Sequence, residues 1–162
     1  MIRAAVIGVG SMGKNHARVY AEMEETELVA VADPARAEQV ARIYKARPYA
    51  DYREMLEKEA VDVVSVAVPT VLHCQVALDV IASGRHVFVE KPLASSLEEG
   101  EAIIQAAERA GVKLGVGHIE RFNPAVLALR ERLDAGDLGR LFQIHARRVG
   151  PYPARVEDVG VV

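Results

Sequence analysis

The sequence predicts a doubly wound α/β domain with a parallel sheet, followed by the beginning of a truncated α+β second domain. Three observations predict it. Short apolar runs alternate with stretches of helical period. Within each run, the residues that would face the two sides of a sheet are both apolar. The pattern changes after residue 117. Such runs are typical of parallel strands covered by helices on both faces. Strand–helix–strand alternation at this spacing predicts right-handed crossovers.

Five apolar runs are predicted as strands, at residues 4–9, 28–32, 61–68, 86–89 and 112–116. Helices are predicted between them, at residues 17–23, 34–44, 74–83 and 95–110. Pro34 is expected at the first position of its helix. Ser95 to Glu98 has the pattern of a capping box, and Gly111 is expected to end the helix that follows.

The later part of the chain has a different pattern. Asn123 and Pro124 are predicted to cap a short amphipathic helix that runs to about Ala135. Residues 141–148 alternate between apolar and polar, which predicts a half-exposed strand that is usually antiparallel. One strand cannot hold a domain together. We therefore expect a dinucleotide-binding domain over residues 1–120 and an incomplete substrate domain over residues 121–162.

Composition excludes several classes of partner. The 162 residues carry 20 basic and 23 acidic side chains, a net charge of -3, which gives no general attraction to nucleic acid or anionic membrane. Cys74 is the single cysteine, so no internal disulfide or cysteine-based zinc site is expected, and no metal site is predicted. No apolar run approaches the ~20 residues of a membrane helix. Met1-Ile2-Arg3 leads straight into a strand-like run, so we expect no signal peptide and a cytoplasmic location.

A glycine motif follows the first predicted strand and opens the first helix. Residues 8–13 read G-x-G-x-x-G, and this context is the one that dinucleotide binding needs. Gly8 permits the tight turn, Gly10 lets the backbone approach a pyrophosphate, and Gly13 lets helix and strand pack closely. The helix N-terminus then points free N–H groups at the phosphates, with Ser11 and Met12 in the same loop.

Asp33 lies twenty residues after Gly13, at the end of the second predicted strand. A carboxylate at this position can hydrogen-bond both ribose hydroxyls of NAD and would repel the extra phosphate of NADP. The prediction is NAD, although Arg36 could partly offset the repulsion. The alternative is a glycine turn with a helix-capping aspartate and no ligand.

Residues that face a ligand in such sheets lie beyond the carboxyl ends of the strands, here at 69–73, 90–92 and 117–122. Near a nicotinamide, Lys91 could hydrogen-bond a reacting hydroxyl and share its proton as hydride leaves. The alternative is a solvated lysine after a strand, and the residues alone do not separate the two. For His73, a polar residue in the first turn of a helix is favoured over a functional role. His118 is less determined still.

Several motifs together resemble the Gfo/Idh/MocA family of oxidoreductases, named after glucose–fructose oxidoreductase, inositol dehydrogenase and a rhizopine catabolism protein. They are the glycine motif, Ala32-Asp33-Pro34, His73 and the run GRHVFVEKPLA at residues 84–94, in which Glu90 follows His73 by seventeen residues. The resemblance covers the whole chain, including residues 117–124 and 138–141.

The resemblance implies an NAD(P)-dependent oxidoreductase that acts on a sugar, cyclitol or related alcohol, with Lys91 as the catalytic lysine. It also implies a strained turn at residues 90–92, with a cis peptide bond before Pro92. His118 and Arg121 become candidates for substrate contacts. The predicted cofactor contacts are Gly8, Gly10, Ser11, Met12, Gly13, Asp33, Pro69, Thr70, His73, Glu90 and Lys91.

The sequence departs from the family pattern at three places. Ile119 stands where the family often has an asparagine that contacts substrate, and Thr70 stands where an asparagine is common, although its hydroxyl can still cap a helix. The family's Asp-x-x-x-His element, whose histidine completes the proton relay, would lie just past Val162.

Residues 117–124 (GHIERFNP) are similar to family members that act as UDP-N-acetylglucosamine 3-dehydrogenases, which suggests a sugar-nucleotide substrate. Arg147 and Arg148 could then meet its diphosphate, although a solvated strand face is favoured for them.

The leading interpretation is a dehydrogenase that oxidises a secondary alcohol by hydride transfer to NAD. Lys91 positions and helps deprotonate the hydroxyl, a histidine outside this sequence is the main base, and the 162 residues alone bind NAD with little turnover. The second interpretation is a non-catalytic NAD-binding regulatory or assembly module. A third is another reaction in the same family, such as double-bond reduction or elimination. A homo-oligomer is expected, because an uncovered strand edge invites pairing.

Overall fold

The computed structural model describes residues 1–147 and residue 149. The chain divides into two compact units, residues 1–117 and the residues from 118 on. In the first unit, six parallel strands form one sheet in the order β3-β2-β1-β4-β5-β6. This strand order is that of the doubly wound dinucleotide-binding fold, and it confirms the predicted fold class.

The strands are β1 (Ile2–Ile7), β2 (Thr26–Ala32), β3 (Arg47–Tyr49), β4 (Val63–Val66), β5 (His86–Val89) and β6 (Leu114–Val116). The helices of the same unit are α1 (Gly13–Glu22), α2 (Ala37–Tyr44), α3 (Tyr52–Lys58), α4 (His73–Ala82) and α5 (Leu97–Ala110). A short 3-10 helix, Thr70–Leu72, precedes α4.

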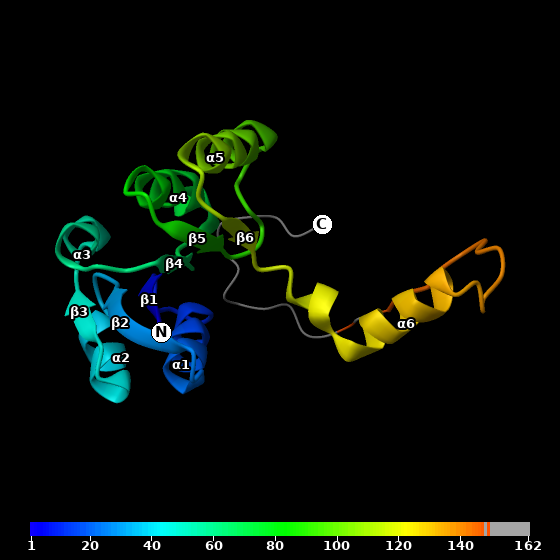
Figure 1. Cartoon of the computed structure of the whole chain (residues 1–162), viewed down its shortest axis with the longest axis horizontal. Coiled ribbons are helices and arrows are strands. Elements are labelled where there is room, and N and C mark those ends of the chain that lie inside the picture. Colours follow the sequence, from blue (N-terminus) through cyan, green and yellow to red (C-terminus); the bar gives the residue numbers. More distant parts are fainter. Residues whose placement is uncertain (148, 150–162) are drawn as a thin grey trace. The chain divides into compact units, whose positions relative to one another are not determined.

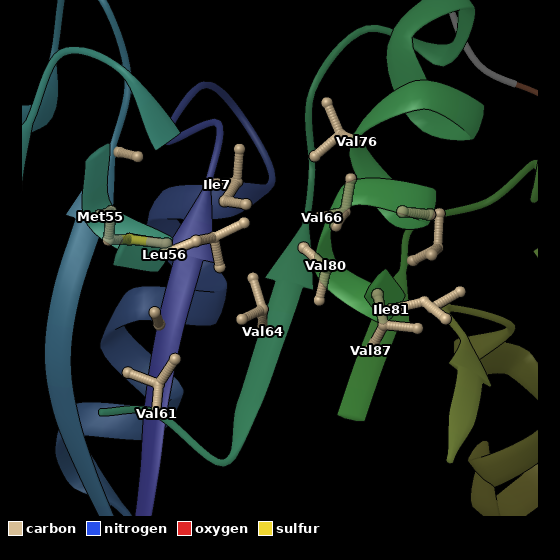
Figure 2. Close-up of a cluster of buried hydrophobic side chains, with 14 of the residues drawn as sticks. Ile7, Met55, Leu56, Val61, Val64, Val66, Val76, Val80, Ile81 and Val87 are labelled. Carbon is tan, nitrogen blue, oxygen red and sulfur yellow. The ribbon is translucent and has the colours of Figure 1, made fainter. Parts of the chain in front are cut away.

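Helices cover both faces of the sheet. Helices α4 and α5 lie over one face, and α1 and α2 lie over the opposite face (Figure 1). The larger core cluster packs β-strand residues such as Ile7, Val64 and Val66 against α3, α4 and α5 (Figure 2). The smaller cluster packs Val6 and Val31 against α1 and α2. Burial on both faces explains why these strands are apolar throughout.

Two elements of the sheet's edge were not predicted. Strand β3 has three residues, Arg47-Pro48-Tyr49, which are exposed or half-buried and contain no apolar run. Helix α3 has seven residues and begins at an N-cap, Asp51, whose side chain accepts a hydrogen bond from the backbone N–H of Arg53 at 2.9 Å. Both elements are too short to produce a clear hydrophobic period.

Several predicted boundaries shift. Helix α1 begins at Gly13, four residues earlier than predicted, and β4 is four residues long. Helix α2 begins at Ala37 and not at Pro34, because the Asp33 carboxylate holds residues 34–36 in a turn. The capping pattern of α5 lies one residue later than predicted. Ser96 caps the backbone N–H of Glu99, whose carboxylate accepts from the Ser95 N–H.

The second unit holds a 3-10 helix, Ile119–Phe122, and α6 (Pro124–Asp134), which begins at its predicted Asn123 cap. The Asn123 side chain accepts from the Ala125 N–H at 3.0 Å. The strand predicted over 141–148 is wrong for residues 141–147, which form no strand. A strand needs a partner for its backbone groups. Arg148 lies outside the described residues. In the described part of the chain, no helix is long and apolar enough to cross a membrane.

Candidate functional site

The site begins where the order of the strands reverses. Strand β1 pairs with β2 on one side and with β4 on the other. The loop after β1 leads to α1 on one face, and the loop after β4 leads to α4 on the opposite face (Figure 1). A crevice opens between two such loops, and this is where open α/β sheets bind their ligands.

The three glycines of the first loop have different environments. Gly8 has φ +81°, and a Cβ there would lie 2.8 Å from the backbone of Ala67 and Val68 in the loop after β4. A Cβ on Gly13 would lie 1.7 Å from the Gly8 carbonyl oxygen. At Gly10, the nearest atom to such a Cβ is a guanidinium nitrogen of Arg36, at 3.8 Å. Gly8 and Gly13 are therefore required for packing, whereas Gly10 leaves space for a ligand against the backbone.

The start of α1 suits an anion. No side chain among the described residues caps this helix, and its first turn carries no acidic residue. The N-terminal N–H groups of a helix bind phosphate when no side chain satisfies them. The residues present therefore fit the pyrophosphate of a dinucleotide at this point.

Asp33 joins two loops. One carboxylate oxygen accepts from the backbone N–H of Val9 at 3.0 Å, and the other accepts from the N–H groups of Ala35 and Arg36, each at 2.9 Å. A carboxylate has about four acceptor positions, so it retains capacity for a ribose hydroxyl. Asp33 does not cap α2, whose N-cap is Arg36, so the helix-capping role that was the alternative is not found. Its side chain organises the turn before the helix, which is compatible with a ligand role.

An open groove of about 410 Å³ lies beside the glycine loop, between α1 and α2. Three cationic side chains, Lys14, Arg18 and Arg36, line it, which suits the phosphate-bearing half of a dinucleotide. Its lining residues are Val9, Gly10, Ser11, Lys14, Asn15, Arg18, Arg36, Gln39, Val40, Ile43 and Tyr44.

The Lys91 turn follows β5, the neighbour of β4 in the sheet. Lys91 is exposed, and the peptide bond between Lys91 and Pro92 is cis, as the resemblance implied. Glu90 points inward: its carboxylate lies 2.9 Å from Nε2 of His16 and accepts from the Lys91 backbone N–H at 3.1 Å. These hydrogen bonds, the one from His16 first, lower the pKa of Glu90 although burial opposes the shift. Its side chain is therefore engaged within the protein.

His73, the first residue of α4, is 1 % exposed. Its Nδ1 lies 2.8 Å from the Pro92 carbonyl oxygen, and its Nε2 lies 3.0 Å from the Val68 carbonyl oxygen. The imidazole thus links the Lys91 turn to the loop after β4. In that loop Pro69 is exposed and Thr70 is buried.

Three polar residues of this region were not predicted: the half-buried His16 and Tyr20, and the buried Ser65. The hydroxyl of Ser65 lies 3.2 Å from Nδ1 of His16 and 2.8 Å from the Tyr20 hydroxyl. Ser65 is fully buried in β4. A serine in the middle of an apolar run was the available signal, because a buried hydroxyl needs a partner. His118 and Arg121 belong to the second unit, where both are exposed.

The comparison with protein families decides the identity of the first unit. The model of the oxidoreductase family with an NAD-binding Rossmann fold, GFO_IDH_MocA, matches residues 2–118. The chain belongs to the Gfo/Idh/MocA family. Its first unit is the NAD-binding domain of that family, as the glycine motif predicted, and its cofactor is NAD.

Two relatives illustrate the range of this family. The chain is 38 % identical over 143 residues to the scyllo-inositol 2-dehydrogenase (NAD(+)) of Bacillus subtilis, a match that covers 86 % of the chain and 42 % of the relative. It is 34 % identical over 161 residues to the UDP-N-acetylglucosamine 3-dehydrogenase of Acidithiobacillus ferrooxidans, a match that covers 99 % of the chain and 50 % of the relative. The chain thus spans about half the length of the curated relatives that it matches.

Among solved structures, the WlbA dehydrogenase from Bordetella pertussis, in complex with NADH and UDP-GlcNAcA, superposes with a TM-score of 0.81. The identity is 32 %, over 86 % of this chain and 43 % of that one. A dehydrogenase with a similar fold therefore binds both NADH and UDP-GlcNAcA.

Proposed function

We propose that the full-length form of this protein, meaning a chain of the relatives' length that carries these residues, is an NAD-dependent dehydrogenase. Its substrate is a secondary alcohol of a sugar, sugar nucleotide or cyclitol. Two names of relatives support this range, an inositol dehydrogenase and a UDP-N-acetylglucosamine dehydrogenase. The residues from 118 on, with His118 and Arg121, would begin the domain that binds the substrate.

The observation that carries the proposal is the position of Lys91. It follows β5 on an exposed turn, and His73 ties that turn to the loop after β4, which borders the crevice. A lysine at this edge of the sheet is within the region where such folds hold the reactive end of a dinucleotide. Most of the remaining predicted contacts belong to residues 8–13 and 69–73, which follow β1 and β4, the two strands that flank the reversal of strand order.

In this proposal the Lys91 ammonium donates a hydrogen bond to the hydroxyl oxygen of the substrate. NAD, when bound, supplies the acceptor for the hydride that leaves the carbon. As the hydroxyl proton leaves, negative charge develops on the oxygen, and the Lys91 ammonium stabilises this charge until the hydride departs. The hydroxyl proton leaves to a base, for which we propose a histidine outside these 162 residues. The products are a ketone, the reduced cofactor and one proton.

The test compares Lys91→Ala with Lys113→Ala in the full-length form. Lys113 is also exposed and follows a different element of the same domain, so it is a matched control. Reduction of NAD is followed by the absorbance of the reduced cofactor, with scyllo-inositol and UDP-N-acetylglucosamine as probes. We expect Lys91→Ala to lower kcat about 10²- to 10⁴-fold. The affinity of Lys91→Ala for NAD should be unchanged, and so should the activity of Lys113→Ala.

A non-catalytic NAD-binding module is the competing function. It predicts NAD binding without turnover of either alcohol, and no effect of Lys91→Ala on any measured property. Activity of the 162 residues alone, equal to that of the full-length form, would show that the main base is misplaced in our proposal.

A further inference from the structure

A chain of buried and half-buried polar groups runs from α1 through β4 to the Lys91 turn. The Tyr20 hydroxyl contacts Ser65, Ser65 contacts Nδ1 of His16, and Nε2 of His16 contacts one carboxylate oxygen of Glu90. The second carboxylate oxygen of Glu90 accepts from the Lys91 backbone N–H at 3.1 Å. The chain thus ends on the main chain of the lysine that we propose to be catalytic.

One assignment of donors satisfies every hydrogen bond of this chain. An ionised carboxylate only accepts hydrogen bonds, so Nε2 of His16 must donate to Glu90. Nδ1 can then accept from the Ser65 hydroxyl, and the Ser65 oxygen can accept from Tyr20. The hydrogen bond from His16 and the one from the Lys91 N–H favour the charged form of Glu90 and lower its pKa. Glu90 is therefore a carboxylate at neutral pH.

The neighbours of the His16–Glu90 pair leave it little freedom. The side chains of His16 and Glu90 are 14 % and 9 % exposed. A Cβ on Gly117, at the end of β6, would lie 3.1 Å from the second oxygen of Glu90. The ring of Phe88 lies 5.7 Å from the ring of His16. The absence of a side chain at Gly117 therefore leaves room for the Glu90 carboxylate, and packing against the Phe88 ring restrains the His16 imidazole.

We propose that His16 and Glu90 are a positioning pair for Lys91. His16 lies in α1 three residues after Gly13, and the pair therefore connects the helix that begins at the glycine loop to the main chain of Lys91. A lysine on an exposed turn loses both backbone freedom and side-chain rotamer freedom when it takes up one position. A fixed main chain removes part of that cost. The catalytic consequence rests on the proposed function, whereas the bracing of the turn does not.

The first experiment measures the bracing without turnover. Amide hydrogen exchange at Lys91 is followed by NMR in the 162-residue chain, for the unmodified protein, His16→Leu, His16→Gln and Tyr20→Phe. Gln retains an N–H donor toward Glu90, whereas Leu does not. Tyr20→Phe removes a hydrogen bond of the same polar chain without touching Glu90, so it is the matched control.

We expect the Lys91 amide to exchange about tenfold faster in His16→Leu, as the loss of a bond to a charged group predicts. Exchange should return close to the original rate in His16→Gln, and Tyr20→Phe should match the unmodified chain. Equal rates in His16→Leu and the unmodified chain would overturn the proposal. Equal acceleration in His16→Leu and Tyr20→Phe would overturn it too, because it would indicate a general loosening of the core.

The second experiment measures kinetics in the full-length form. His16→Leu should lower kcat about 10- to 100-fold, as a small displacement of a catalytic group predicts. The KM for NAD should change less than about twofold, since uniform binding is not affected. A raised KM with unchanged kcat would overturn the positioning role. If Lys91→Ala keeps full activity, the proposed function fails, and the exchange rates still decide whether the pair braces the turn.

Discussion

The carboxylate of Asp33 lies 3.0 Å from the backbone nitrogen of Val9 and joins the end of β2 to the middle of the glycine-rich loop. The same side chain organises the turn that leads to α2. One aspartate therefore shapes the glycine-rich loop and stands where the adenosine ribose binds in this fold. We propose that its contributions to stability and to cofactor choice are coupled.

Replacement of Asp33 by Asn tests this coupling. The amide nitrogen of Asn cannot accept from the Val9 N–H, so one buried donor loses its partner. We expect a loss of about 1–3 kcal/mol in the free energy of unfolding, measured with urea. NAD affinity should fall while NADP binding falls less, because the charge that repels the extra phosphate is gone. Unchanged stability, or a larger loss for NADP than for NAD, would contradict this account of Asp33.

Gly10 and Gly13 provide a matched pair of variants. Gly13→Ala places a Cβ 1.7 Å from the Gly8 carbonyl oxygen, a clash with backbone that cannot move easily. We expect it to cost more than about 4 kcal/mol or to prevent folding. The added Cβ of Gly10→Ala meets only the flexible end of Arg36. The free energy of unfolding of this variant should lie within about 1 kcal/mol of that of the unmodified chain.

NAD titrations separate the two further. Gly10→Ala should fold normally and bind NAD at least about tenfold more weakly, since its methyl group occupies the space over the backbone. Circular dichroism checks the fold of each variant. Unchanged NAD affinity in Gly10→Ala would indicate that the pyrophosphate does not bind over the backbone of Gly10.

Glu90 predicts a loss of stability in acid. Its pKa is lowered in the folded state, mainly by the hydrogen bond from His16. A lowered folded-state pKa gives stability above the ordinary glutamate pKa of about 4.3, and this stability disappears as the pH falls through the folded-state value. We therefore expect the stability difference between the unmodified chain and Glu90→Gln to shrink as the pH falls below about 4.3. A difference that is constant from pH 7 to pH 3 would contradict the ionised pair.

Tyr52 predicts the opposite trend in alkali. Its hydroxyl donates to Asp79 at 2.7 Å, and burial together with this bond raises its pKa to about 12. A raised folded-state pKa gives stability that is complete below the ordinary tyrosine pKa of about 10 and is lost as the pH rises through the folded-state value. Above about pH 10, the free energy of unfolding should therefore fall less in Tyr52→Phe than in the unmodified chain. An equal loss of stability at alkaline pH in Tyr52→Phe and in the unmodified chain would contradict this role of Tyr52.

The sequence predicted the centre of the fold better than its edges. The glycine motif and the apolar runs placed β1, β2, β4, β5 and α1, because buried parallel strands and a fixed turn leave strong local signals. β3 and α3 left none, since they are short and half-exposed. The alternation of residues 141–148 predicted a strand that residues 141–147 do not form. A strand depends on a partner, which a local pattern does not reveal.

The candidate site divides in the same way. Gly8, Gly13 and Asp33 lie where their spacing predicted, because each position is set by local backbone geometry. His16 could not be assigned from its spacing, since its partner Glu90 is 74 residues away in the sequence. For Glu90, the sequence suggested a cofactor contact, and the inward direction of its side chain depends on α1. The ligand roles of all the predicted site residues, Lys91, His118 and Arg121 included, stay predictions.

The most direct test of the central claim is a calorimetric titration of the 162-residue chain with NAD. We predict saturable binding at one site per chain, weakened in Gly10→Ala and Asp33→Asn, with NADP bound more weakly than NAD. A folded chain that shows no saturable heat with NAD, or that binds it equally well in Gly10→Ala, would contradict the placement of the cofactor over the glycine loop.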